Sequence, residues 1–249
     1  TVRGRLATVG FVEGVSAANG IVYVASFGRG LLIIDATNPA APTLLTELRT
    51  PGTPHAVQAV GSLVYLADDF NGLVIVDVSN PAAPTVRSTL RSAGVAVGVT
   101  VVNDRAYLAY QGQGLRIVDV SNPGAPRRLG QLDTPGLASA VSVTGNLALV
   151  ADSEALQIVD VGNPAAPTLA GAYRELAVNV QALNGLAFIA DRESLLLVNI
   201  NQPAAPVLVG LYDPPGAAQD VALAGDLAFV ASANDGLQVF GLSDPAQPQ

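Results

Sequence analysis

The sequence predicts an all-β fold, a six-bladed β-propeller with four antiparallel strands per blade. The first observation behind this prediction is a cassette, typified by residues 73–85, that recurs along the chain and contains an Asn-Pro or related turn. The turn prolines are Pro39, Pro81, Pro123, Pro164, Pro203 and Pro245, separated by 42, 42, 41, 39 and 42 residues. Repeats of this length are typical of propellers and solenoids, whose units cannot bury their apolar faces alone.

Each repeat contains four short segments with strand character. In the second copy these segments are residues 55–60, 63–67, 73–78 and 84–90. The third segment is apolar at successive positions, which indicates a strand covered on both faces. The fourth follows a proline turn, and proline is tolerated at sheet edges, so we expect it at the outer edge of the blade.

The first two strands of every repeat are joined by a dipeptide that tolerates positive φ. The six dipeptides are Asn19-Gly20, Gly61-Ser62, Asn103-Asp104, Gly145-Asn146, Asn184-Gly185 and Gly225-Asp226. Two-residue hairpin turns of the primed types need such residues. The turn chemistry therefore predicts a tight hairpin at the same place in each repeat.

The two ends of the chain fit one closed ring. Residues 2–11 resemble a fourth strand, whereas the C-terminus stops at Gln249, where the fourth strand of the last repeat is due. We therefore expect residues 2–11 to be the outer strand of the last blade and to close the ring, because closure removes an exposed sheet edge. Residues 1–249 then form a single β-propeller domain.

The composition excludes several functional classes. Twelve Lys and Arg against 20 Asp and Glu give a net charge of −8, which repels nucleic-acid phosphates. No apolar run approaches the ~18 residues of a membrane-spanning helix. Cysteine is absent, which excludes disulfides and thiolate metal sites. Methionine is absent too, so we expect a processed chain from which any signal peptide has been removed.

The stretch Leu73–Asp77 resembles the LVIVD-repeat family, and the resemblance covers essentially the whole chain. Related stretches end at Asp35, Asp119 and Asp160. The resemblance implies a β-propeller, and it implies export, since the family occurs mostly in secreted and surface proteins of bacteria and archaea. It implies no catalytic activity, because the family shares no catalytic motif. The fifth and sixth repeats depart from the pattern, with Asn199 and Gly241 in place of the aspartate.

The cassette aspartate is a candidate for bracing its own turn or for binding a ligand. Aspartate carboxylates readily accept hydrogen bonds from nearby backbone N–H groups, and this one directly precedes the turn. Two of the six repeats lack it, so it is not an obligatory member of a six-fold functional ring. We therefore favour turn bracing.

Polar residues at the start of the first strands should lie near one mouth of the central channel. They are Glu13, His55, Ser139, Asn179, Gln219 and Asp220. The sole histidine has no second histidine or thiol to complete a site, so we predict no catalytic residue. Glu13, Asn179 and Asp220 are similar to the ligands that hold calcium in some six-bladed hydrolases and lactonases, but calcium takes six to eight oxygens. A polar, hydrated channel lining is the simpler interpretation.

The loops between second and third strands should open on the same face. Unlike the strands, these loops vary from repeat to repeat, and recognition is often located in variable loops on a rigid scaffold. Their acidic residues are candidate partner-binding groups: Asp68, Asp69, Asp152, Glu154, Asp191, Glu193 and Asp235. The alternative is that they are polar hairpin tips without a function.

The leading hypothesis is a non-catalytic protein- or ligand-binding or structural module of an exported or cell-surface protein, without a cofactor. Its partner would be a protein or a surface polymer. One alternative is a calcium-assisted hydrolase or lactonase-like enzyme with its site at the channel. A further alternative is a structural subunit of a surface filament or layer, which the apolar composition and the low share of charged residues, 13%, also fit.

Overall fold

The computed structural model describes residues 3–8, 10–214, 216–233 and 236–242. The chain divides into two compact units, residues 1–110 with 118–128 and residues 111–117 with 129–249, and each is considered by itself. The described residues form 23 strands in six antiparallel sheets. None of them belongs to a helix that could cross a membrane.

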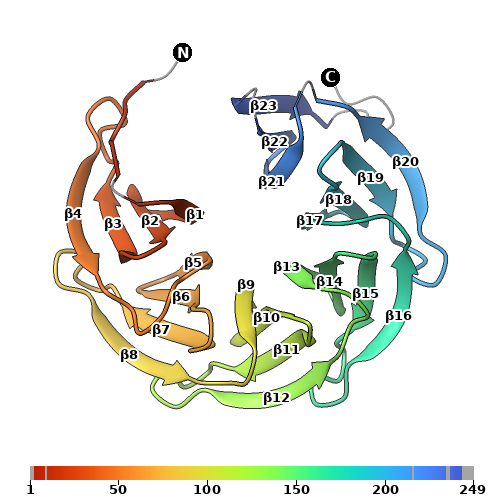
Figure 1. The fold of residues 1–249 in the computed structure, drawn as a ribbon, viewed down its shortest axis with the longest axis horizontal. Coiled ribbons are helices and arrows are strands. Elements are labelled where there is room, and N and C mark those ends of the chain that lie inside the picture. The colour runs from red at the N-terminus through yellow and green to blue at the C-terminus, as the bar shows by residue number, and fades with distance from the viewer. Residues whose placement is uncertain (1–2, 9, 215, 234–235, 243–249) are drawn as a thin grey trace. The chain divides into compact units, whose positions relative to one another are not determined.

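The first two sheets belong to the first unit, and their strands follow chain order (Figure 1). The first sheet contains β1 (Val12–Ala18), β2 (Ile21–Ser26), β3 (Gly30–Asp35) and β4 (Thr43–Leu48). The second contains β5 (Ala56–Val60), β6 (Leu63–Ala67), β7 (Leu73–Asp77) and β8 (Thr85–Leu90). The second sheet matches the four predicted segments to within one residue at every boundary.

The remaining sheets are built from the later repeats in the same order. The third contains β9 (Val95–Val102), β10 (Arg105–Gln111), β11 (Gly114–Asp119) and β12 (Arg127–Leu132). The fourth contains β13 (Ala138–Thr144), β14 (Leu147–Asp152), β15 (Leu156–Asp160) and β16 (Thr168–Tyr173). The fifth contains β17 (Asn179–Leu183), β18 (Leu186–Ala190), β19 (Leu195–Asn199) and β20 (Val207–Tyr212). The sixth contains β21 (Ala218–Ala224), β22 (Leu227–Ser232) and β23 (Gly236–Gly241).

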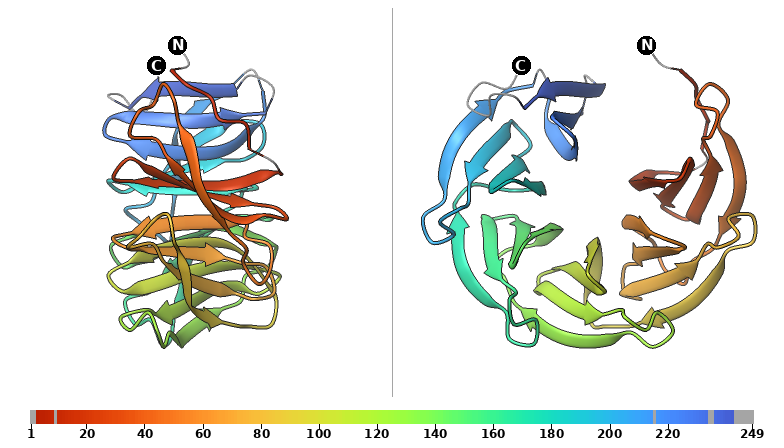
Figure 2. Two further views of the ribbon diagram at one scale, coloured as in Figure 1. Left: turned by 90° about the vertical axis from the view of Figure 1, so that its left-hand side faces the viewer. Right: turned by 180° about the vertical axis from the view of Figure 1, so that it is seen from behind.

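Six antiparallel sheets from six consecutive repeats are the blades of a six-bladed β-propeller (Figures 1 and 2). The predicted fold class is confirmed. The sixth blade has three strands among the described residues, whereas the other five have four.

The predicted hairpin turns are confirmed by the backbone. Both residues have positive φ in Asn19-Gly20, Asn103-Asp104 and Asn184-Gly185, as type I′ turns require. In the other three turns the leading glycine alone has positive φ, which is the type II′ pattern: Gly61, Gly145 and Gly225. The turn type therefore follows the residue pair in each repeat.

The third strands form the core, as their apolar sequences predict. In β7, residues 73–76 are at most 1% exposed, and β3, β15 and β19 are buried in the same way. The exception is β23, where Leu237 is 63% and Val239 48% exposed. Within the second unit the sixth sheet packs on the fifth through Val230 and Phe240.

A recurring contact joins the fourth strand of one blade to the proline turn of the next repeat. Ser88, the fourth residue of β8, donates its hydroxyl to the Pro123 carbonyl at 2.6 Å. Gly171 has the same position in β16 and lies so close to the Pro203 carbonyl that a Cβ atom would overlap it. Gly130 in β12 makes the equivalent contact. A small residue at this position is therefore a packing requirement between blades.

The expected ring closure by residues 2–11 stays a prediction. The described residues 3–8 form no strand, and residues 2 and 9 lie outside the described residues. Gly4 nevertheless lies against the Pro39 carbonyl of the first repeat, as Gly171 lies against Pro203. This segment thus contacts the first blade in the way that a fourth strand contacts the next blade.

The cassette aspartates brace their turns, as predicted. Asp119 Oδ1 accepts hydrogen bonds from the Ser121 N–H at 3.0 Å and from the Ser121 hydroxyl at 2.6 Å. These bonds and the Arg127 guanidinium lower the pKa of Asp119 to about 2. Carboxylates in three other repeats bind the same N–H: Asp35, Asp77 and Asp160. In the fifth repeat the amide oxygen of Asn199 replaces the carboxylate and accepts from the Asn201 N–H.

The contact between blades predicts the effect of adding one methyl group. Gly171→Ala would push a Cβ into the Pro203 carbonyl, and overpacking of this kind costs about 1–3 kcal/mol. Gly124→Ala is the matched control, because other repeats have alanine there and the nearest atom to its Cβ is 3.5 Å away. Urea unfolding should show G171A destabilised and G124A close to wild type. Equal stability of the two variants would contradict the proposed packing role.

The turn geometry predicts how the pKa of Asp119 responds to a substitution of Ser121. Ser121→Ala removes the hydroxyl that contributes most to the low pKa of Asp119, so this pKa should rise toward its usual range. Because the folded-state pKa is depressed, the stabilising contribution is present above the unfolded pKa and is lost as pH falls through about 2. A carboxyl-carbon NMR titration of wild type and S121A measures the change. An Asp119 titration that S121A leaves unmoved would show that the hydroxyl has no such effect.

Candidate functional site

The predicted mouth residues are divided between the two units. Glu13 and His55 belong to the first unit. The second unit contains the other four: Ser139, Asn179, Gln219 and Asp220. Each group is therefore described inside its own unit.

In the first unit the structure brings Glu13 and His55 together. His55 Nδ1 lies 2.5 Å from Glu13 Oε2, and the pair joins the start of β1 to the residue that precedes β5. Both side chains reach solvent, with 32% of Glu13 and 25% of His55 exposed. The His55 N–H donates to the Ala67 carbonyl at 2.9 Å, which fixes the histidine beside the end of β6.

Asp68 is buried and holds the linker that leads into the second blade. Its Oδ1 accepts from the Thr50 hydroxyl at 2.9 Å, and its Oδ2 accepts from the Gly52 N–H at 2.8 Å. Burial raises the pKa of Asp68, and these two hydrogen bonds oppose that rise. Both carboxylate oxygens of Asp68, a predicted partner-binding residue, therefore accept hydrogen bonds inside the protein.

Asp152 has the same role in the second unit. It is also fully buried, and its Oδ2 accepts from the Gly136 N–H at 3.1 Å while its Oδ1 accepts from the Glu154 N–H at 3.0 Å. Asp191 accepts the backbone N–H groups of its own loop, from Glu193 at 2.8 Å and Ser194 at 2.5 Å. These carboxylates at the ends of the second strands hold the loop backbone in place.

The accessible acidic candidates are at the loop tips. Glu154 and Glu193 are exposed, and Asp69 is half-buried. Asp69 also has positive φ, 51°, and its carbonyl accepts from the Ala96 N–H at 3.0 Å. Asp235 lies outside the described residues.

The mouth residues of the second unit do not form one cluster of free polar groups. The Ser139 hydroxyl donates to the Val178 carbonyl at 2.7 Å, and Asp220 Oδ1 accepts from the Val221 N–H at 2.8 Å. Surrounding protein raises the pKa of Asp220 although the residue still reaches solvent. Asn179 Oδ1 is buried, and no described residue hydrogen-bonds to it. Gln219 lines an open hollow of about 360 Å³ on the sixth blade.

The calcium hypothesis gains no support from these positions. Across the described part of the chain, no three His, Asp or Glu side chains lie close enough to hold a metal ion. Calcium takes six to eight oxygens, and one oxygen of Asp220 already accepts a backbone N–H. The predicted set of Glu13, Asn179 and Asp220 is divided between the two units, so this calcium site stays a prediction.

Sequence reasoning missed a group of exposed phenylalanines at the loop ends of the first unit. Phe11 is 78%, Phe27 53% and Phe70 67% exposed. The Phe27 N–H donates to the Phe11 carbonyl at 2.8 Å, so the β2–β3 loop lies beside the linker that precedes β1. The available signal was the placement of Phe27 and Phe70 at loop positions where other repeats have small or polar residues.

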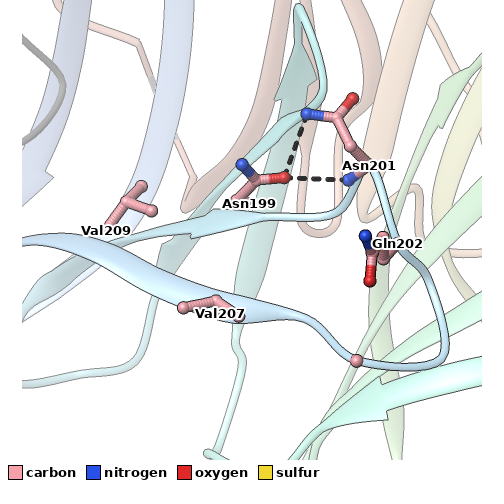
Figure 3. A pocket seen from close by; sticks show the side chains of 6 residues that line it. Asn199, Asn201, Gln202, Val207 and Val209 are labelled. Atoms are coloured by element: carbon pink, nitrogen blue, oxygen red, sulfur yellow. Dashed lines mark hydrogen bonds between the residues drawn. The ribbon is translucent and has the colours of Figure 1, made fainter.

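A second hollow, of about 340 Å³, lies in the second unit beside β20 (Figure 3). It is lined by Asn199, Asn201, Gln202, Ala205, Val207 and Val209. Both the N–H and the Nδ2 of Asn201 donate to Asn199 Oδ1 at 3.0 Å, so the amides partly satisfy each other.

The repeat pattern matches a known family in six consecutive segments. The LVIVD repeat is found at residues 9–50, 51–90, 93–134, 135–175, 176–214 and 215–249. The chain belongs to the LVIVD-repeat family. This confirms the resemblance that the cassette Leu73–Asp77 carries. No curated protein matches the sequence of this LVIVD-repeat propeller.

Solved structures confirm the fold. A protein from Lactobacillus plantarum is 14% identical, with a TM-score of 0.83 over 99% of this chain and 85% of that one. The β-propeller domain of Cps50 (Swd1) from Myceliophteria thermophila is 13% identical, with a TM-score of 0.74 over 93% and 84%. BamB from Moraxella catarrhalis is 11% identical, with a TM-score of 0.62 over 94% and 84%. At these identities the similarity concerns the fold alone.

The burial of Asp68 predicts a pH dependence of stability. Because its pKa is raised in the folded protein, the folded state holds this proton more tightly than the unfolded state. Wild type should therefore lose stability relative to Asp68→Asn as pH rises from below to above the usual aspartate pKa, about 3.9. Urea unfolding across this range measures the difference.

Asp69→Asn is the control for this prediction, since it removes a carboxylate from the same loop without touching Thr50 or Gly52. The difference in free energy of unfolding between wild type and D68N should vary with pH more than the difference between wild type and D69N. A stability difference between wild type and D68N that stays constant with pH would show that burial does not shift the pKa of Asp68.

Proposed function

We propose that this LVIVD-repeat propeller is a non-catalytic binding module of an exported or cell-surface protein. Its binding surfaces are the loop ends, defined as residues 27–29 and 68–72 in the first unit and residues 153–155 and 191–194 in the second. The propeller fold with LVIVD repeats is that of a binding or structural module. Membership of a family that occurs mostly in secreted and surface proteins supports the exported location.

The observation that carries this proposal is that two of these loops, 68–72 and 153–155, have a fixed base and an exposed tip. Asp68 and Asp152 hold the bases by hydrogen bonds to the preceding linkers. The tips expose chemically different side chains, among them Phe70 and Glu154. A surface that is held rigid loses little conformational entropy on binding, which favours recognition.

The contacts of His55 support a role in binding or construction rather than in catalysis. Nucleophilic catalysis requires a hydroxyl, thiol or amine within hydrogen-bond reach of the base. Among the described residues, the His55 ring is hydrogen-bonded to Glu13 alone. The pair thus connects the first and second blades at the loop ends.

The proposal predicts that partner binding depends on the loop tips. The double variant Asp69→Asn/Glu193→Gln removes two carboxylates from these tips. Asp104→Asn/Asp226→Asn removes the same charge from exposed hairpin turns at the opposite ends of the strands. Immobilised wild type, incubated with envelope extract from the producing cells, should retain a partner that the hairpin-turn variant also retains.

The loop-tip variant should retain about tenfold less of that partner, as expected for loss of hot-spot contacts. Mass spectrometry identifies and quantifies the retained protein or polymer. Equal retention by all three proteins would contradict a loop-end surface. Turnover of an ester or lactone by the purified wild type would contradict the non-catalytic assignment.

A further inference from the structure

Three exposed phenylalanines mark one part of the loop ends as different from the rest. Phe11, Phe27 and Phe70 together with the carboxylates of Glu13 and Asp69 are here called the phenylalanine patch. Each of the three rings is more than half exposed, whereas Phe188 and Phe240 are buried. Aromatic side chains that are exposed on a soluble protein are enriched at partner interfaces.

Hydrogen bonds connect the segments that carry the patch across the first two blades. Phe27 is hydrogen-bonded to Phe11 through the backbone, which joins the tip of the first blade to its own linker. Glu13 follows Phe11 by two residues and contacts His55 of the second blade at 2.5 Å. His55 is bonded to Ala67 at the end of β6, directly before the loop that carries Asp69 and Phe70.

The scaffold beneath the patch is well held. Asp68, next to Asp69, is bonded to Thr50 and Gly52, and its own N–H donates to the Gly72 carbonyl at 2.8 Å. A folded-back loop would bury the ring of Phe70, but this ring stays 67% exposed. The exposure is therefore fixed by the loop geometry.

The size of the patch suits the centre of an interface. A phenylalanine buries roughly 150–250 Å² when fully covered, so three partly exposed rings offer a few hundred Å². A standard interface takes about 800 Å² from each partner. The patch can thus supply the apolar centre, with polar loop atoms as the surrounding rim.

The charges of the patch select the kind of partner. Asp69 directly precedes Phe70, and Glu13, two residues after Phe11, contacts His55 through one carboxylate oxygen, while Arg29 is paired with Glu47 at 3.4 Å. A second copy of this chain carries a net charge of −8 and would bring further carboxylates against Glu13 and Asp69. An anionic lipid surface is disfavoured for the same reason. Charge complementarity favours a partner with basic side chains.

We propose that the phenylalanine patch binds a protein segment in which aliphatic or aromatic side chains alternate with lysine or arginine. The apolar side chains of this segment pack on Phe27 and Phe70, and its basic groups pair with Glu13 and Asp69. This inference rests on the proposed binding function and assigns its surface and partner class.

Three synthetic peptides of equal length test the assignment by fluorescence anisotropy. One contains leucine and lysine, the second leucine and glutamate, and the third serine and lysine. Wild type should bind the leucine–lysine peptide at least about tenfold more tightly than either other peptide, since only this peptide satisfies both rings and carboxylates. Equal binding of the leucine–glutamate peptide would overturn the charge assignment, and absence of binding would overturn the proposal.

Two double variants locate the binding surface. Phe27→Ser/Phe70→Ser removes two rings of the patch. Leu44→Ser/Leu169→Ser removes comparable exposed apolar side chains, 50% and 56% exposed, from the outer strands β4 and β16. The phenylalanine variant should bind the leucine–lysine peptide at least about tenfold more weakly, and the leucine variant should match wild type. Equal binding by all three proteins would show that attraction to an acidic protein is nonspecific.

Further outcomes separate this inference from the proposed function. If F27S/F70S retains the envelope partner and D69N/E193Q loses it, the assignment of binding to the phenylalanine rings is wrong, and the proposed loop-end function stands. If sedimentation shows that wild type is a dimer and F27S/F70S a monomer, the patch binds a second copy of this chain, and the proposed basic partner is wrong. If both variants retain the envelope partner, the loop-end function fails together with this inference.

Discussion

The contact between a fourth strand and the next proline turn is the constraint on which the blades depend. Ser88 donates to the Pro123 carbonyl, and Gly171 lets the Pro203 carbonyl approach its backbone directly. A longer side chain at either position would overlap the carbonyl of the next proline turn. The shortest interval between turn prolines, 39 residues from Pro164 to Pro203, still ends in this contact. The repeat can therefore change in length, whereas the contact between blades is kept.

Local chemistry made much of this fold predictable. A hairpin turn depends on two adjacent residues, so Asn19-Gly20 and Gly61 reveal both the turn and its type. The cassette aspartate needs only a partner two residues away, as Asp119 and Ser121 show. Such short-range interactions can be predicted from a single sequence because the interacting groups are neighbours in the chain.

The role of the loop carboxylates was not predictable by the same reasoning. Asp68 and Asp69 are adjacent and chemically identical, yet Asp68 is buried and Asp69 is not. The difference arises from Gly52, which lies 16 residues earlier and reaches Asp68 only in the folded sheet. Asp152 is bound by Gly136 across the same separation. A sequence shows two acidic loop residues in each case, and only the fold shows which of them faces solvent.

The separation between base and tip explains why recognition can be placed at the loop ends. Substituting a buried carboxylate at the base of a loop, such as Asp152, leaves a backbone N–H without its partner, which costs about 1–3 kcal/mol. Changes at an exposed tip are usually within about 0.5 kcal/mol, so tips can diverge without harming the scaffold. The two units illustrate this freedom, with phenylalanines at Phe27 and Phe70 in the first and carboxylates at Glu154 and Glu193 in the second. Six similar repeats can therefore present chemically different surfaces.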